Sequence, residues 1–194
     1  MPVQDPQNLD IPQGQTWSVV FRWAQPRKVY KPITNAFQEA PLRLEVSDHG
    51  IPDGWDFRIT GVRGMTRIND RDCIAIVLNA NEIEVNEINA AAFEAYTSGG
   101  WIEYLMPMDL DGFTARMQIR ESLDSDDVLE ELTTDNDGIV LDNEAKTITV
   151  QMPAEETAAI DWKSGYYSLE LTDDDGRVFG VAAGRIVLCR DATR

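Results

Sequence analysis

The strongest constraint on the fold is the strict alternation of apolar and polar residues along Phe113–Arg120, which reads Phe-Thr-Ala-Arg-Met-Gln-Ile-Arg. Alternation with a period of two puts the apolar side chains on one face of an extended chain and the polar ones on the other. A slip of one residue would turn Arg116 and Arg120 into the core, so the register is determined as well as the conformation. The segment is therefore predicted to be a half-buried β-strand.

The same pattern recurs along most of the chain. Thr16–Trp23 is predicted to be a strand with an aromatic inward face. Further strands are predicted at Leu42–Val46, Trp55–Ile59, Ile74–Leu78, Glu82–Ile88, Trp101–Leu105, Ile139–Leu141, Thr147–Met152, Tyr166–Thr172, Val178–Val181 and Arg185–Arg190. The Asp-Gly pairs at Asp137-Gly138 and Asp175-Gly176 are suited to tight turns, and the second predicts a hairpin.

Helix is expected to be scarce. Pro153–Ile160 has proline at a suitable first position, two acidic residues near its start and Gly165 shortly after its end, so it predicts one short helix linking two strands. The alanines of Ile88–Tyr96 suggest a second helical turn. The expected fold class is all-β with at most one or two short helices.

Length and charge limit the function. The 194 residues are 43% hydrophobic, enough to bury the core of one ordinary domain or two small ones. The net charge of −17 would repel nucleic acid and anionic lipid, so neither is an expected partner. The longest aliphatic run, Ile74–Leu78, is far too short to span a bilayer, and Met1–Asp5 lacks a basic start, so we expect a soluble chain made without a signal peptide.

Acidity is concentrated in the last third of the chain. Ten Asp and Glu residues and no Lys or Arg lie between Glu121 and Glu144, a stretch called the acidic segment below. Such a block usually forms a solvated face or loop. We expect it to face solvent or a partner rather than to hold a specific metal ion.

The middle of the chain predicts an insertion. Residues 31–106 are dense in Gly, Asn and Pro and have short strands of their own, whereas residues 1–30 and 107–194 would form a separate, discontinuous host. With the insertion removed, Thr16–Trp23 would meet the strand at Phe113 in a simple hairpin. Residues 1–13, with three prolines and few apolar side chains, are expected to form an extended arm that orders only in an assembly.

The host resembles an immunoglobulin-like β-sandwich family of tailed-phage virions, described as LtfC-like or baseplate-associated. The resemblance rests on the order and spacing of Gly14–Trp23, Asp109–Arg120, Ile148–Met152, Gly165–Leu171, Gly184–Arg190 and Thr193–Arg194. It covers most of the host and implies a structural role in tail fibres or baseplates.

The insertion resembles a small β-barrel known from the first catalytic cysteine half-domain of ubiquitin-activating enzymes. The residues that carry this resemblance are Asp48–Gly54, Gly61–Asn69, Glu82–Val85 and Tyr96–Gly100, within Pro41–Leu105. The resemblance implies a fold and no ubiquitin chemistry.

Few residues are candidates for catalysis or metal binding. His49 could be a general base or a metal ligand, but no nucleophile motif accompanies it, so we interpret it as a turn histidine bonded to backbone. Cys73 and Cys189 have no CxxC spacing and lie in predicted strands, so both are expected to be small buried residues.

Carboxylates and aromatic residues have similarly plain interpretations. Asp124/Asp126/Asp127, Asp135/Asp137 and Asp173/Asp174/Asp175 offer oxygen ligands, but none follows a calcium-loop pattern. Glu155 and Glu156 are adjacent on a short helix and would point apart, which does not suit glycoside hydrolysis. The five tryptophans could form a sugar-stacking platform, although at strand spacing they more often belong to the core, and either Tyr166 or Tyr167 must face outward.

These observations lead to one expected function and two alternatives. We expect a structural component of a tailed-phage virion, made in the host cytoplasm and resident in the particle: a tail, fibre-adaptor or baseplate subunit, homo-oligomeric and in contact with other virion proteins. No catalytic, cofactor or metal site is expected. The alternatives are a carbohydrate-binding module that contacts the host surface and a capsid decoration protein.

Overall fold

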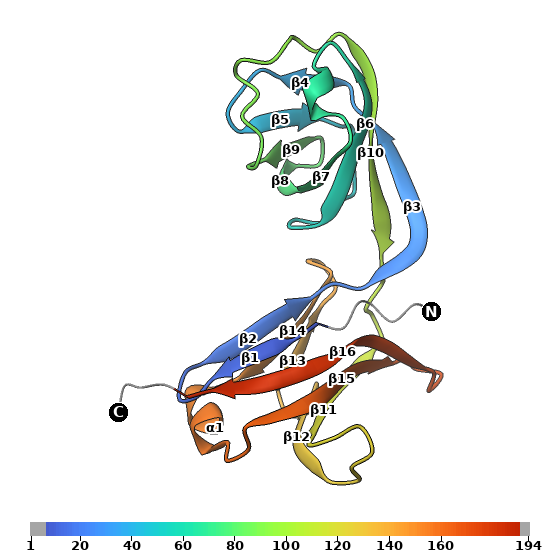
Figure 1. Ribbon diagram of the computed structural model, residues 1–194. Coiled ribbons are helices and arrows are strands. Elements are labelled where there is room, and N and C mark those ends of the chain that lie inside the picture. The colour runs from blue at the N-terminus through green and yellow to red at the C-terminus, as the bar shows by residue number, and fades with distance from the viewer. Residues whose placement is uncertain (1–6, 191–194) are drawn as a thin grey trace. The chain divides into compact units, whose positions relative to one another are not determined.

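The computed structural model describes residues 7–190 and consists mainly of β-strands (Figure 1). In this part of the chain sixteen strands form four sheets, with one α-helix and one short 3-10 helix, so the all-β prediction is confirmed. Over the same residues, no helix has the length and hydropathy needed to cross a membrane.

The chain divides into two compact units. The sandwich unit comprises Met1–Trp23 and Asp109–Arg194, and the barrel unit comprises Ala24–Met108. The first boundary lies seven residues before the expected one because Ala24–Pro32 is a single strand, β3. It pairs at Lys28–Pro32 and again at Ala24 with β10, Ser98–Pro107, so it belongs to the barrel unit.

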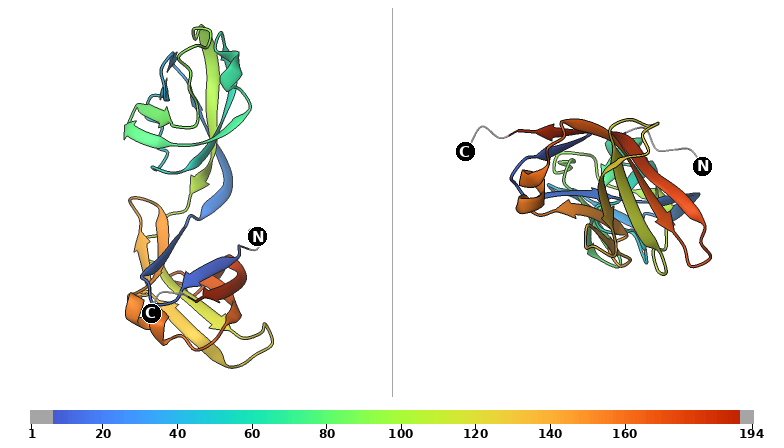
Figure 2. Two further views of the ribbon diagram at one scale, coloured as in Figure 1. Left: turned by 60° about the vertical axis from the view of Figure 1, so that its left-hand side comes forward. Right: turned by 90° about the horizontal axis from the view of Figure 1, so that it is seen from below.

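Two sheets make up the sandwich unit (Figures 1 and 2). The larger sheet has the order β1-β16-β15-β11-β12, with strands Leu9–Pro12, Val178–Cys189, Ser164–Thr172, Thr114–Arg120 and Val128–Thr133. The smaller sheet has the order β13-β14-β2, with strands Ile139–Asp142, Thr147–Met152 and Trp17–Phe21. Alternate residues of both sheets fill the space between them, as the period-two pattern requires: Met117, Ile119, Ile148, Val150 and Leu169 are all fully buried.

Strand β1 contradicts part of the expected arm. Leu9–Pro12 pairs in parallel with β16, and the side chains of Leu9 and Ile11 are buried in the sandwich. Pro12 is tolerated because β1 lies at the edge of its sheet, where a missing N–H group breaks no internal ladder. The first six residues of the proposed arm lie outside the described part of the chain.

The expected hairpin across the insertion point is wrong. β2 lies in the smaller sheet and β11 in the larger, so the sandwich chain changes sheets where the barrel unit is inserted. An aromatic cluster marks this place: the ring of Trp23 lies 5.7 Å from Phe113 and 5.4 Å from Phe179, between ring centroids. The hairpin predicted at Asp175-Gly176 is confirmed, because β15 and β16 pair in antiparallel fashion on either side of it.

The barrel unit is built from two four-stranded sheets. One has the order β3-β10-β6-β7, where β10 is Ser98–Pro107, β6 is Asp56–Arg63 and β7 is Arg71–Ile74. The other has the order β4-β5-β9-β8, with strands Asn35–Phe37, Leu42–Glu45, Glu82–Val85 and Ile76–Asn79. Only Ile33 and Thr34 separate β3 from β4, and only Ala75 separates β7 from β8. Both edges of the first sheet thus continue into the edges of the second, which closes the unit as a small barrel.

Glycines allow the long strands of the barrel to bend. Gly100 in β10 has φ of 97°, and a Cβ atom there would lie 2.4 Å from Cγ2 of Val62 in β6. A residue with a side chain would therefore be strained and would clash with the neighbouring strand.

Of the two segments predicted to be helical, one forms a helix and the other does not. The predicted short helix is present as α1, Ala154–Ala159, between β14 and β15, and the hydroxyl of its buried Thr157 donates a hydrogen bond to the backbone oxygen of Gln15 at 2.8 Å. Ile88–Tyr96 is not helical, because its backbone bonds to other loops: Ala90 donates to the oxygen of Glu39. The 3-10 helix η1, Thr66–Ile68, follows β6.

Candidate functional site

The sheet β3-β10-β6-β7 has one face turned away from the barrel core. Cross-strand partners in its ladders point to the same side, and alternate residues, such as Ile59, Cys73 and Ile102, are buried. The other set forms what we call the outer face: Lys28, Tyr30, Pro32, Asp56, Arg58, Thr60, Asp72, Ile74, Trp101, Glu103 and Leu105.

Large apolar side chains are exposed on the outer face. Tyr30 is 54% exposed, Trp101 48%, Ile74 47% and Leu105 43%. Tyr30 lies opposite Glu103, and Trp101 lies two residues along β10 from Glu103, so the two aromatic residues are diagonal neighbours. Diagonal neighbours on adjacent strands have Cα atoms roughly 7–8 Å apart, which lets two rings share one ligand surface.

Ion pairs cross the outer face from edge strand β3 to edge strand β7. The ammonium of Lys28 lies 2.7 Å from a carboxylate oxygen of Glu103, and the guanidinium of Arg58 lies 2.9 Å from Asp72. Arg58 also lies 3.6 Å from Asp70 at the end of the neighbouring turn. Hydrogen bonding to Glu103 raises the pKa of Lys28, and hydrogen bonding to Asp72 raises that of Arg58. The charges are therefore paired, but they stay in contact with water.

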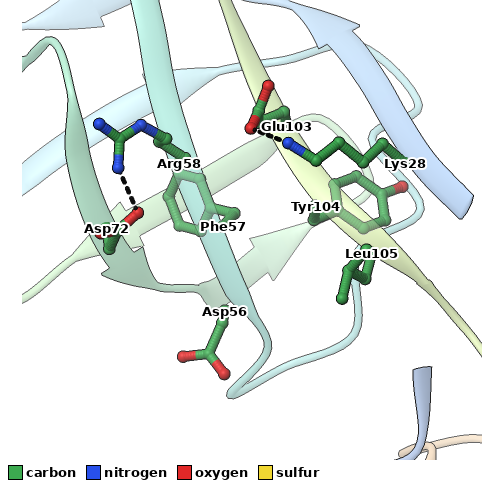
Figure 3. A pocket seen from close by; sticks show the side chains of 8 residues that line it. All are labelled: Lys28, Asp56, Phe57, Arg58, Asp72, Glu103, Tyr104 and Leu105. Atoms are coloured by element: carbon green, nitrogen blue, oxygen red, sulfur yellow. Dashed lines mark hydrogen bonds and ion pairs between the residues drawn. The ribbon is translucent and has the colours of Figure 1, made fainter. Parts of the chain in front are cut away.

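A hollow of about 420 Å³ opens beside these ion pairs (Figure 3). The pairing of β10 with β6 ends at Glu103 and Arg58. The hollow lies past this last pair, where its lining includes Phe57, Tyr104 and Leu105. Phe57 and Tyr104 are buried, so the exposed apolar surface of the hollow comes mainly from Leu105, beside a charged rim. The volume falls within the roughly 300–1,000 Å³ of small-ligand sites.

A second cavity, the acidic cavity, lies in the sandwich unit and has a volume of about 670 Å³. Its lining includes four carboxylates, Glu130, Glu131, Asp137 and Glu156, and no Lys or Arg. Glu130 stands opposite the buried Ile119 on edge strand β12 and is turned toward the sandwich interior. An inward-facing charge of this kind protects an edge strand from pairing with another chain.

Burial distinguishes Glu130 from the rest of the acidic segment. Partial burial raises the pKa of Glu130, and the nearby carboxylates of Glu156 and Asp161 raise it further. Interaction with the Trp162 side chain lowers it in part. The expectation that the acidic segment faces solvent or a partner is therefore wrong for Glu130, which is half-buried and turned inward. The pair that comes together is Glu130 with Glu156, rather than Glu155 with Glu156, and sequence spacing could not reveal it because the two lie on different elements.

We expect Glu130→Gln to raise the melting temperature of the sandwich unit by a few degrees at pH 7. A raised folded-state pKa means that folding disfavours the charged form of Glu130. The resulting loss of stability is present above the folded-state pKa and absent below about 4.5, the ordinary pKa of Glu. The gain should therefore vanish as the pH falls below about 4. Calorimetric melts between pH 4 and pH 8 measure this. Asp126→Asn, which removes the same charge from an exposed loop, is the control, and an equal gain in both variants would contradict the assignment to burial.

His49 is confirmed as a turn histidine bonded to backbone. It is buried in the barrel unit, where the backbone N–H of Ile51 donates to Nδ1 at 3.2 Å and Nε2 lies 2.7 Å from the backbone oxygen of Asn79. Since Nδ1 accepts, Nε2 carries the proton and donates. The phenol of Tyr104 donates to the backbone oxygen of His49 at 2.6 Å, which holds the turn against β10.

His49→Ala is expected to destabilise the barrel unit by roughly 2–4 kcal/mol, since it leaves an N–H and a carbonyl unpaired and opens a cavity. For a unit of this size the melting temperature should fall by roughly 10–25 °C. Thermal unfolding followed by circular dichroism measures the change, with Glu87→Ala on the exposed surface as control. Unchanged melting would mean that the histidine has no structural role.

The remaining candidate residues differ in how exposed their side chains are. Trp17, Trp23 and Trp55 are buried as expected for core residues, whereas Trp101 is exposed; of the adjacent tyrosines, Tyr167 is buried and Tyr166 faces outward. Within residues 7–190 no group of three His, Cys, Asp or Glu side chains is placed to hold a metal ion.

Cys73 is buried, but Cys189 is exposed at the end of β16, so the expectation that both cysteines are buried is wrong for Cys189.

The outer face was missed at the sequence level. Trp101–Leu105 was predicted to be a strand, and its alternation already put Trp101, Glu103 and Leu105 on one side. The neighbouring strand β3 went unpredicted because the expected boundary at residue 30 cut through it. No protein-family model matches the chain, and no curated protein matches it in sequence.

Proposed function

We propose that this protein is a structural component of a tailed-phage virion, as a tail, fibre-adaptor or baseplate subunit that acts through contacts with neighbouring proteins. Support comes from the all-β architecture with one unit inserted in another. We also propose that the sandwich is immunoglobulin-like, and its two layers of five and three strands support this.

The observation that carries the proposal is the unpaired acidic segment. Among residues 7–190, none of its ten carboxylates forms an ion pair with Lys or Arg. In the same segment Leu123 is 80% exposed and Val128 is also exposed. An apolar side chain among unpaired charges of one sign is a suitable contact for a partner with basic residues.

The partner at this surface is a different protein rather than a second copy. The sandwich unit has 22 acidic and 9 basic residues, a net charge of −13, so two copies of the acidic segment would repel each other. Copies of the chain in a symmetric particle would then meet through other surfaces.

The test is gold labelling of tailed-phage particles from the same source with an antibody against the protein. Gold at the tail tip, baseplate or fibre attachment site supports the proposal, whereas gold on the head favours a decoration protein. Absence of the protein from washed particles by mass spectrometry would overturn it. Release of the protein at high salt is expected because screening weakens contacts between opposite charges.

We also propose that the protein catalyses no reaction. Protein incubated with host cell wall, capsular polysaccharide and peptides should release no product above a blank. Glu130 and Glu156 make this a demanding test, because a carboxylic acid of raised pKa beside a second carboxylate can act in general acid–base catalysis. Turnover that is lost in Glu130→Gln, Glu156→Gln or His49→Ala would overturn the proposal.

A further inference from the structure

Charged and apolar side chains alternate across the outer face of the barrel unit. Glu103 is flanked by Tyr30, Trp101 and Leu105, its partner Lys28 lies on edge strand β3, and the Arg58–Asp72 pair lies on β6 and β7. Protein–protein interfaces instead have an apolar centre depleted of charge and a polar rim. A protein docked over Trp101 and Tyr30 would have to desolvate the ion pair of Glu103 with Lys28, which opposes binding.

A hydrated ligand with apolar patches avoids this cost. Sugar rings have such a character: their C–H faces pack against aromatic rings, whose faces carry negative charge density, and their hydroxyls exchange hydrogen bonds with charged side chains. The carboxylates Asp56, Asp72 and Glu103 outnumber the cations Lys28 and Arg58 on this face, so an anionic ligand would be repelled.

We propose that the outer face binds an uncharged carbohydrate. Trp101 and Tyr30 stack on sugar rings, while Lys28, Glu103 and Arg58 bond to ring hydroxyls. The adjoining hollow, in which Leu105 is the exposed apolar side chain, accommodates a neighbouring sugar or branch (Figure 3). This assignment concerns the barrel unit alone and does not depend on a place in a virion.

The experiment is affinity electrophoresis of the intact protein in native gels. The gels contain neutral polysaccharides (dextran, β-1,3-glucan, galactomannan, hydroxyethylcellulose) or the anionic polysaccharides alginate and hyaluronate. We expect retardation by at least one neutral polymer, weakened roughly tenfold by Trp101→Ala and by Tyr30→Ala. The matched control is Tyr166→Ala, which removes an exposed aromatic side chain from a strand of the sandwich unit and should bind like the unchanged protein.

Every outcome bears on the proposal. Trp101 and Tyr30 are exposed, so the variants should melt like the unchanged protein, and calorimetry checks this. Lack of retardation by every neutral polymer, equal loss in the Tyr166→Ala control, or stronger retardation by alginate would overturn it. Dimerisation that Trp101→Ala abolishes, seen by analytical ultracentrifugation, would overturn it in favour of a protein interface. Labelling of virions leaves the result of this experiment unchanged, so the two proposals can fail separately.

Discussion

A fragment of residues 24–108 should unfold in a single cooperative transition, whereas a fragment of residues 31–106 should melt at least about 15 °C lower or give random-coil dichroism. The shorter fragment lacks Ala24–Tyr30, the part of β3 that pairs with β10 through Lys28, Val29 and Tyr30. Its loss opens the barrel along β10 and uncovers core residues beneath, including the buried Tyr104. Units of this size have little stability to spare, so one missing strand has a large effect.

The comparison has an internal control. Removing residues 107–108 from the longer fragment while keeping residue 24 as its start gives a fragment of residues 24–106, which separates the effect of β3 from that of the other end. Equal melting of the 24–108 and 31–106 fragments would show that β3 adds no stability. Random-coil dichroism of both would show that the barrel unit requires the sandwich unit.

Cys189 should react completely with iodoacetamide in the native protein at pH 8, while Cys73 should remain at least a hundredfold slower. Cys73 is buried in the barrel core, and burial raises its pKa to about 11, so roughly 0.1% is thiolate at pH 8. Cys189 is exposed at the end of β16. Mass spectrometry of tryptic peptides after timed quenching gives both rates.

Single-cysteine variants make the labelling decisive. Cys189→Ser should leave a protein that takes up label only when urea is added, and Cys73→Ser should label like the unchanged protein. Rapid modification of Cys73 without denaturant would mean that the barrel core opens in the native state. Slow modification of Cys189 would mean that something covers the end of β16.

Strands with clear alternation were predictable from the sequence alone. Thr147–Met152 has the expected bounds, and Phe113–Arg120 differs from β11 by one residue. The helix at Pro153–Ile160 also followed from local signals, namely its proline, acidic first turn and glycine. These features depend on neighbours along the chain, so a sequence pattern contains them.

Other strands form only because a partner is present. β3 has the polar sequence Ala-Gln-Pro-Arg-Lys-Val-Tyr-Lys-Pro, and its extended shape comes from the ladder offered by β10. β12 lies inside the acidic segment, where charge hid the apolar positions that pair with β11. Two strands predicted at Val178–Val181 and Arg185–Arg190 are one long strand, β16, because β15 pairs with it from Val178 to Val187 and β1 continues the pairing to Cys189.

The candidate site was likewise determined partly by the sequence pattern and partly by the tertiary structure. Alternation in Trp101–Leu105 determined that Trp101, Glu103 and Leu105 share a face, because side-chain direction in a strand repeats every two residues. Alternation could not determine which strands flank that face, so the pairing of Glu103 with Lys28 and the approach of Arg58 to Asp72 were decided by the tertiary structure. The opposition of Glu130 to the buried Ile119 and the exposure of Cys189 were decided in the same way. Direction along a strand is a local property of the backbone, whereas pairing and burial depend on contacts between residues far apart in the chain.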